Sequence, residues 1–212
     1  MKKSVWLLVT TAFFTSLLWS STVSAGGLDG FIGVSGGSGE AEKDSDIDSW
    51  DIDSNSVAGC FVFDISPANQ SLFNYRLNVG FAGQDFEDVY DDSLESTGIY
   101  IENIFGFAII KKESLCWWLG PLVRIGYYTG EDNSLLVGTD LEGDYAEFGV
   151  GAVTGLNFKA GTVTMFPSIG LRYSGYDGTG DVIYNGYSYE YSYKNDIDDH
   201  ATTFFANFAI LF

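Results

Sequence analysis

The final stretch, residues 201–212, constrains the fold more than any other part of the sequence because large apolar side chains recur at every second position. One face of an extended strand would carry Phe204, Ala206, Phe208, Ile210 and Phe212. The opposite face would mix smaller, polar and apolar residues: Thr203, Phe205, Asn207, Ala209 and Leu211. This period is expected of a strand with lipid on one side and a filled interior on the other. Because an exposed apolar edge strand invites aggregation and a closed barrel has no edge, the stretch predicts the last strand of a membrane-spanning β-barrel.

Seven earlier segments repeat this alternation, and each is long enough for a tilted strand to cross a bilayer, which takes about 9 to 11 residues. They are residues 28–38, 56–65, 72–83, 97–110, 115–128, 145–158 and 162–174. The alternation is clearest in the third, where Phe73, Leu77 and Phe81 would face lipid. With 26 Gly, only 3 Pro and no sustained helical period, the sequence predicts an all-β fold of one domain. That fold is an eight-stranded antiparallel transmembrane up-and-down β-barrel.

The connections between the predicted strands alternate in length. The short ones are residues 66–71, 111–114 and 160–161, and the long ones are residues 39–55, 84–96, 129–144 and 175–199. Short periplasmic turns and long extracellular loops are typical of transmembrane barrels. Most of the 29 acidic residues fall in the long connections, so we expect extended, acidic extracellular loops.

The last long connection contains its own hairpin signal. Asn185-Gly186 is a preferred two-residue turn, and tyrosines alternate with other residues on the strand that follows it. The pattern predicts that the seventh and eighth strands continue past the membrane as a protruding, Tyr-lined ribbon.

Residues 1–25 have the pattern of a secretory signal peptide. Lys2 and Lys3 precede an apolar run over residues 5–19, and Val23-Ser24-Ala25 forms a small-residue cleavage site. An uncleaved N-terminal anchor is the alternative. The predicted barrel domain is therefore residues 26–212. The formal net charge of −19 argues against nucleic acid as a partner, because phosphate binding needs an excess of Lys and Arg.

Six charged residues fall on the predicted inner faces: Asp64, Arg76, Glu102, Arg124, Glu147 and Arg172. Charges inside a narrow barrel are tolerated when they are paired and hydrogen-bonded. The hairpin spacing predicts that Asp64 lies opposite Arg76 and that Glu102 lies opposite Arg124, with the other two as diagonal neighbours. Eight strands leave an interior that side chains just fill, which favours a charge-balanced plug over the alternative, a gated ion path.

Cys60 and Cys116 both fall on inner faces, on the second and fifth predicted strands. Such strands lie roughly opposite each other in a ring of eight, whereas a disulfide needs Cα atoms within about 7 Å. We therefore expect two free, buried thiols.

His200 is the only histidine and falls on the outer face at the extracellular end of the last strand. With Thr202 on the same face and Asp198 or Glu190 nearby, a hydroxyl, an imidazole and a carboxylate would be available for nucleophilic catalysis. Thr is usually a poorer nucleophile than Ser, and no distinctive carboxylate partner is present. The simpler interpretation is an interfacial histidine, so we expect no enzyme activity and no cofactor.

The acids Asp44, Asp46 and Asp48 have the spacing that begins a calcium-binding loop. The complete motif fails, because Ser49 stands where the loop requires Gly and Asn55 where it requires Glu. A solvated acidic run is the simpler interpretation. The alternative is loose Ca²⁺ or Mg²⁺ binding that bridges the loop to lipopolysaccharide phosphates.

Taken together, the leader, eight alternating strands, acidic outer loops and terminal Phe212 resemble the small OmpA/OmpX-type outer-membrane β-barrel family over the whole mature chain. The resemblance implies export to the periplasm and insertion into the bacterial outer membrane, among outer-membrane lipids and lipopolysaccharide. It also implies that the barrel-assembly machinery recognises a signal on the closing strand: Phe204, Phe208, Ile210 and Phe212. The family implies no activity.

The function expected from these features is a structural or surface-interaction role of a monomer. Specificity for an extracellular protein partner would lie in the acidic, Tyr-rich outer loops, because alternating Tyr offers rigid amphipathic contact area. A narrow pore for small solutes is the alternative, followed by a lipid A-modifying enzyme centred on His200.

Overall fold

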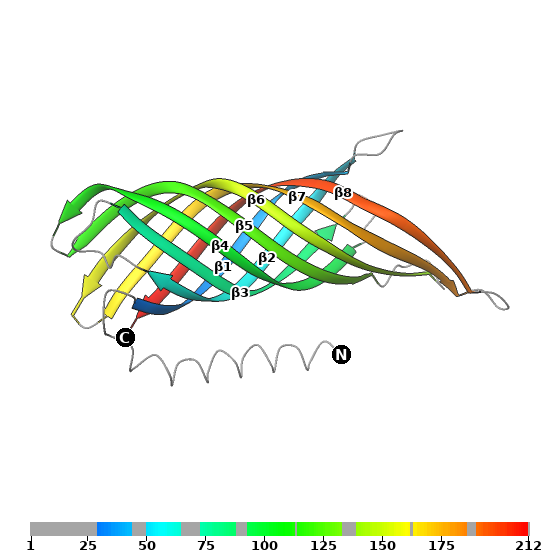
Figure 1. Cartoon of the computed structure of the whole chain (residues 1–212), viewed down its shortest axis with the longest axis horizontal. Helices are drawn as coiled ribbons and strands as arrows, with labels where there is room; N and C mark the ends of the chain where they lie inside the picture. The colour runs from blue at the N-terminus through cyan, green and yellow to red at the C-terminus, as the bar shows by residue number, and fades with distance from the viewer. Residues whose placement is uncertain are drawn as a thin grey trace.

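The computed structural model describes residues 29–43, 50–64, 73–87, 93–112, 114–132, 139–161, 163–185 and 190–211. Eight strands make up almost all of it: β1 (Asp29–Lys43), β2 (Trp50–Asp64), β3 (Phe73–Glu87), β4 (Ser93–Lys112), β5 (Leu115–Asp132), β6 (Thr139–Ala160), β7 (Val163–Asn185) and β8 (Glu190–Leu211). Each strand pairs antiparallel with the next, and β8 pairs with β1 to close the barrel (Figure 1). The predicted fold class is thus confirmed in strand number, direction and closure.

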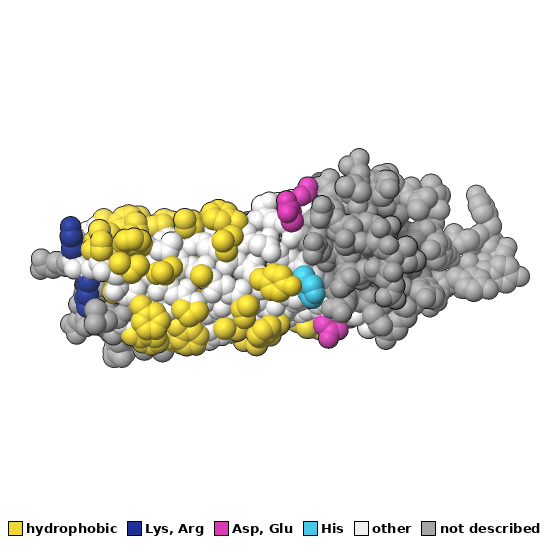
Figure 2. Space-filling model, turned by 90° about the horizontal axis from the view of Figure 1, so that it is seen from above, with side chains coloured by type: hydrophobic (Ala, Val, Ile, Leu, Met, Phe, Trp, Pro, Cys, Tyr) yellow, Lys and Arg dark blue, Asp and Glu magenta, His cyan; other side chains and the backbone are white. Residues whose placement is uncertain are grey.

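The inward and outward faces follow the two-residue period of the sequence. On β8, Phe204 is 53% exposed while its neighbour Phe205 is 2% exposed. On β3, Phe81 is 62% exposed and the next residue, Ala82, is buried. Figure 2 shows hydrophobic side chains spread over the outer wall of the barrel. A wall that exposes so much apolar surface on every strand suits hydrocarbon rather than water.

The strands are longer than the hydrophobic alternation predicted, and the difference lies at one end. Each predicted boundary beside a short connection is correct to within a few residues, whereas every strand continues into a segment that was predicted to be a long connection. Extended loops are therefore not confirmed. Backbone hydrogen bonding continues where both faces are polar, so alternation of apolar residues marks only the part of a strand that faces lipid.

The predicted ribbon of the last two strands is present. β7 and β8 remain paired as far as Asn185 and Glu190, beyond the end of the β1–β2 hairpin (Figure 1). The side chains of residues 180–199 lie outside the described part of the structure, so the lining of the ribbon by tyrosines stays a prediction.

One irregularity interrupts the alternation. Ala108 pairs with Trp118 and Ile110 with Trp117, so Ile109 is an extra residue in β4. This bulge exposes both Ile109 and Ile110 on the outer wall. A simple period of two would have turned Ile110 inward.

Several glycines leave space that aromatic rings occupy in the barrel interior. A Cβ atom on Gly155 would lie 2.5 Å from Cζ2 of Trp118, and one on Gly170 would lie 2.5 Å from Cζ of Phe205. The narrow interior therefore accepts a Trp and a Phe because the facing positions carry no side chain.

Three sequence predictions fall on residues outside the described part of the chain. They are the signal peptide of residues 1–25, the acidic run Asp44, Asp46 and Asp48, and the terminal Phe212 of the assembly signal. Among the residues that the structure describes, no helix is long and apolar enough to cross a membrane.

Candidate functional site

The barrel interior, or lumen, contains all six charged residues that were predicted to face inward. The first pair joins β2 to β3. Asp64 lies opposite Arg76 in the strand register, as the turn spacing predicts, and Arg76 Nη2 is 2.9 Å from Asp64 Oδ2. Asn74 donates a second hydrogen bond to the same carboxylate oxygen, at 3.1 Å. Both charges are buried, so their mutual hydrogen bonding offsets part of the cost of leaving water.

Arg76 also reaches across the lumen. Its guanidinium lies between the rings of Trp118 and Phe166, at 5.0 and 4.9 Å from the ring centroids. Its Nη2 donates to Asn157 Oδ1 at 3.3 Å, and Trp118 Nε1 donates to the same oxygen at 2.7 Å. One arginine from β3 thus contacts side chains of β2, β5, β6 and β7. We call Asp64, Arg76, Trp118, Asn157 and Phe166 the lower layer.

An apolar layer follows along the barrel axis. On β5, Leu122 lies between Trp118 of the lower layer and Arg124. It packs with other residues that are at most 2% exposed: Ile104, Val153 and Phe205. Their side chains come from β4, β5, β6 and β8, so an ion would meet no polar partner on that side of the lumen.

A second ionic group, here called the upper layer, is centred on Glu147. Arg124 Nε donates to Glu147 Oε2 at 2.9 Å, and Arg172 Nε lies 3.2 Å from Oε1. Two hydroxyls complete the arrangement: Tyr128 donates to Oε2 at 2.8 Å and Ser174 to Oε1 at 2.7 Å. Glu147 is 1% exposed, and four donors from the two flanking strands converge on its carboxylate. Such a fully bonded buried carboxylate holds β5, β6 and β7 in one arrangement.

The prediction that Glu102 pairs with Arg124 is wrong, although the two residues lie opposite each other in the strand register, as predicted. Glu102 accepts a hydrogen bond from Asn78 Nδ2 at 2.8 Å instead, and it lies 3.8 Å from Arg172 Nη1. Glycines on two strands make room for this arrangement. A Cβ atom on Gly126, the residue opposite Glu147, would lie 3.1 Å from Glu147 Oε2. The space beside Gly149, opposite Arg124, is taken by Arg172, whose Cδ would lie 2.8 Å from a Cβ atom there.

Glu147 and Arg172 do contact each other, yet they are not diagonal neighbours. Glu147 lies opposite Tyr176, and Arg172 lies opposite Gly151. The contact at 3.2 Å depends on the length of the arginine side chain and on the missing side chain at Gly149, where a Cβ atom would lie 2.8 Å from Cδ of Arg172.

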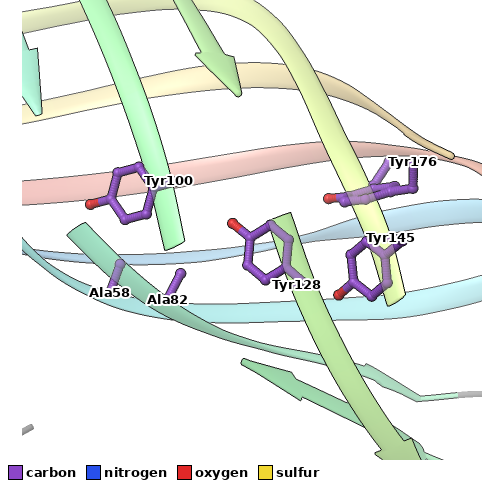
Figure 3. Packing of buried hydrophobic residues seen from close by; sticks show 7 residues of the cluster. Ala58, Ala82, Tyr100, Tyr128, Tyr145 and Tyr176 are labelled. Atoms are coloured by element: carbon purple, nitrogen blue, oxygen red, sulfur yellow. The ribbon is translucent and has the colours of Figure 1, made fainter. Parts of the chain in front are cut away.

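Buried tyrosines gather in the lumen in a further cluster (Figure 3). The rings of Tyr128 and Tyr145 stack at 5.2 Å, and Tyr176 meets Tyr145 edge-on at 5.6 Å. Phe86 packs edge-on against Tyr176 at 5.4 Å. The Tyr145 hydroxyl donates to Gln84 Oε1 at 3.0 Å. We call Phe86, Tyr128, Tyr145 and Tyr176 the aromatic cap.

Tyr100 lies in the same part of the lumen, where Arg124 Cζ is 3.8 Å from the centre of its ring. The residues of the aromatic cap were not assigned to the lumen from the sequence. The cap was missed because its residues lie at or beyond the ends of the predicted strands. A signal was present, since Tyr128, Tyr145 and Tyr176 continue the inward parity of Arg124, Glu147 and Arg172.

Both cysteines are unpaired in the structure. Cys116 is buried and Cys60 is partly exposed. Their strands, β2 and β5, are not neighbours in the barrel, which agrees with the expected separation.

The alternative catalytic group finds little support in its geometry. The His200 ring lies 5.7 Å from that of Tyr173, and its Nδ1 has no hydrogen-bond partner among the described residues. Thr202 is exposed on the same face, while the side chains of Asp198 and Glu190 lie outside the described part. An activated nucleophile needs an oriented base, and nothing described here orients this imidazole. In the described ranges, moreover, no group of three or more metal-binding side chains is present.

Comparisons with known proteins place this geometry among solved β-barrel structures. Neisserial surface protein A (NspA) aligns over 90% of this chain and 100% of its own, with 11% identity and a TM-score of 0.45. A major outer membrane protein from Thermus thermophilus aligns over 85% and 98%, with 11% identity and a TM-score of 0.46. The outer membrane protein AlkL aligns over 89% and 93%, with 14% identity and a TM-score of 0.39. No family model matches the sequence, and no curated protein matches it.

Proposed function

We propose that this chain is a monomeric bacterial outer-membrane β-barrel of the small OmpA/OmpX type, with a closed lumen and a structural or surface-interaction role. The observation that carries the proposal is the lumen, which is filled by the lower layer, the apolar layer, the upper layer and the aromatic cap. If side chains fill the barrel along its axis, only the outer wall and the two ends are accessible to lipid or to a partner.

The outer wall supports a location in a bilayer. Exposed residues such as Phe81, Ile99 and Phe148 lie on strands all around the barrel. Lys111, Lys112 and Lys159 are exposed at the end with short turns. Figure 2 shows Lys and Arg side chains at that end of the apolar wall and acidic side chains towards the other. The short-turn end would face the periplasm and the acidic end the exterior.

The extended end supports an interaction role outside the cell. Paired strand continues beyond the wall on β7 and β8, up to Asn185 and Glu190. Unneeded length in a membrane anchor costs conformational entropy, whereas a stiff projecting hairpin presents a surface to a partner. Residues 175–199 carry one base, Lys194, against six acids: Asp177, Asp181, Glu190, Asp196, Asp198 and Asp199. Electrostatic attraction would then favour basic partners.

A narrow pore is the second candidate, and the apolar layer argues against it. Leu122 and Val153 are each 1% exposed, and Arg76 is also buried in the lumen. An ion would have to separate the buried pairs and also pass this apolar cluster. The lipid-modifying enzyme is not favoured, for the reasons given for His200.

Ion conductance tests the proposal. The purified full chain, inserted in planar lipid bilayers, should give no steady current steps in potassium chloride. The double variant Leu122→Ala/Phe205→Ala removes the apolar layer and should allow intermittent currents. A matched double variant on the outer wall, Phe81→Ala/Ile99→Ala, should remain silent. Steady, well-defined openings of the unaltered protein would support the pore and contradict the proposal.

A further inference from the structure

The rim of the barrel at its short-turn end carries three exposed lysines in one sector. Lys111 and Lys112 end β4, and Lys159 lies one residue before the end of β6. β5 lies between these two strands, and a backbone hydrogen bond of 3.0 Å from Lys159 N to Ser114 O joins β6 to the β4–β5 turn. Neighbouring strands lie about 4.8 Å apart, so the backbones of β4 and β6 are about 10 Å apart. We call Lys111, Lys112 and Lys159 the basic patch.

Acidic residues do not balance the basic patch. Among the residues that the structure describes, none forms an ion pair with its three lysines. Asp64 is buried and bonded to Arg76, and Asp29 begins β1, on the opposite side of the ring from β5. Glu113 follows Lys112 in the sequence and lies outside the described part. Even with Glu113 counted, this sector has more bases than acids.

The outer wall next to the basic patch is apolar. Trp117 and Leu119 of β5 and Leu156 of β6 are between 39% and 47% exposed. Trp117 Nε1 already donates to Thr154 Oγ1 at 2.8 Å, so the indole offers mainly its apolar ring to a ligand. Figure 2 shows Lys and Arg side chains where the hydrophobic wall ends. A lysine can lay its apolar stem along such a wall while its ammonium group stays at the level of the lipid headgroups.

We propose that the basic patch binds the phosphate group of an anionic glycerophospholipid, whose acyl chains lie along Trp117, Leu119 and Leu156. The inference rests on the proposed function, because the wall must lie in a bilayer for one lipid to meet both surfaces. Near a membrane surface, each basic residue is worth about a fivefold gain in affinity for anionic lipid. A zwitterionic lipid has the same phosphate but also a cationic group that the lysines repel. A soluble acidic protein would use the lysines and leave the apolar wall unused, so a lipid is the better fit.

Lipid binding to the full chain in a non-ionic detergent gives the first test, with native mass spectrometry as the readout. At low salt, phosphatidylglycerol should bind at least tenfold more tightly than phosphatidylcholine with the same acyl chains. The preference should shrink as the concentration of ammonium acetate rises, because the lysines are exposed. Glycerol phosphate at the same concentration should not displace the lipid, since it lacks acyl chains. Equal affinity for the two lipids, or displacement by glycerol phosphate, would overturn the proposal.

Charge variants test whether the basic patch is the site. Lys111→Gln/Lys112→Gln/Lys159→Gln should reduce the preference for phosphatidylglycerol to less than twofold. The control Lys43→Gln/Lys194→Gln removes two bases towards the other end of the barrel, on β1 and β8, and should keep the preference at least eightfold. Circular dichroism should show the same β-sheet content in both variants. Equal losses of preference would mean that the lipid senses only net charge, which contradicts a site at the patch.

Fluorescence quenching tests where the acyl chains lie. In nanodiscs, phosphatidylglycerol with brominated acyl chains should quench the tryptophan fluorescence of the full chain at least twofold more than brominated phosphatidylcholine does at the same mole fraction. Trp117→Phe should remove most of this difference, because Trp118 is buried in the lumen. A difference that persists in this variant would place the lipid elsewhere and overturn the proposal.

The lipid site and the proposed function fail separately. Loss of the lipid preference would leave an outer-membrane barrel with a closed lumen intact. Steady ion conductance would instead contradict the closed lumen and leave the lipid result standing.

Discussion

Arg124 donates from Nε to Glu147 Oε2 at 2.9 Å, although the residue opposite it on β4 is Glu102. A glycine makes room for this contact, because a Cβ atom on Gly126, the residue opposite Glu147, would lie 3.1 Å from the same Oε2. Register therefore determines which side chains lie near one another, and the empty positions between them determine which pairs form.

The first prediction concerns Glu147. Glu147→Ala leaves Arg124 and Arg172 buried without their shared carboxylate, and breaking a buried pair in this way costs about 3–5 kcal/mol. Glu102→Ala should cost less, because its contact with Arg172 is long, at 3.8 Å. Urea unfolding of the barrel from lipid vesicles measures both. Equal losses in the two variants would contradict the central place of Glu147.

The second prediction concerns which carboxylate, Glu147 or Glu102, is energetically coupled to Arg124. If Arg124 acts mainly through Glu147, Arg124→Ala/Glu147→Ala should be destabilised less than the sum of its two single variants. Arg124→Ala/Glu102→Ala should be close to additive. Additive losses for both doubles would show that neither carboxylate is coupled to the arginine.

The third prediction uses a pair of glycines on opposite faces. Gly155→Ala places a Cβ atom 2.5 Å from the Trp118 ring, and overpacking of this kind costs about 1–3 kcal/mol. Gly59→Ala is the matched control, because its Cβ would meet nothing within 4 Å. It should change the free energy of unfolding little. If the two variants unfold alike, Trp118 does not lie over Gly155.

Much of this architecture was predictable from the sequence. The outward positions of Phe73, Phe81 and Phe204 follow from the alternation alone, because hydrocarbon selects apolar side chains on one face of every strand. The hairpin of the last two strands was predictable from Asn185-Gly186 and the alternating tyrosines. The other strand ends beyond the membrane were not, because lipid imposes the apolar alternation and its pressure stops at the edge of the bilayer.

The charged residues of the lumen were predictable, but only some of their ion pairs were. Asp64 and Arg76 are both buried and therefore need a partner, and a short turn brings them together. The partners of Glu147 depend instead on side-chain length and on glycines of neighbouring strands, which no period records. The bulge at Ile109 was not predicted either, because two adjacent isoleucines are equally compatible with a regular strand.

The fourth prediction concerns the two cysteines. Their strands are not adjacent, so mass spectrometry of the oxidised, folded protein should give a mass that reduction leaves unchanged. After unfolding, both Cys60 and Cys116 should react with an alkylating reagent. A mass shift on reduction that corresponds to one bridge would contradict the strand order of the barrel.

The fifth prediction addresses the enzyme alternative. His200→Ala should leave the lipid A mass profile of cells that produce the barrel unchanged, because no described group orients the imidazole for catalysis. Thr202→Ala should behave in the same way. Loss of a lipid A modification in both variants, with the barrel still folded, would reinstate the catalytic interpretation.

The central claim is a closed barrel whose apolar face meets lipid while its charges are enclosed, and nuclear magnetic resonance in nanodiscs tests it directly. A backbone contact should join Val34 of β1 to Phe208 of β8 across the closing seam. A paramagnetic lipid should broaden the signals of the Phe81 side chain and spare those of Tyr100. Absence of the seam contact, or equal broadening of both rings, would contradict the account.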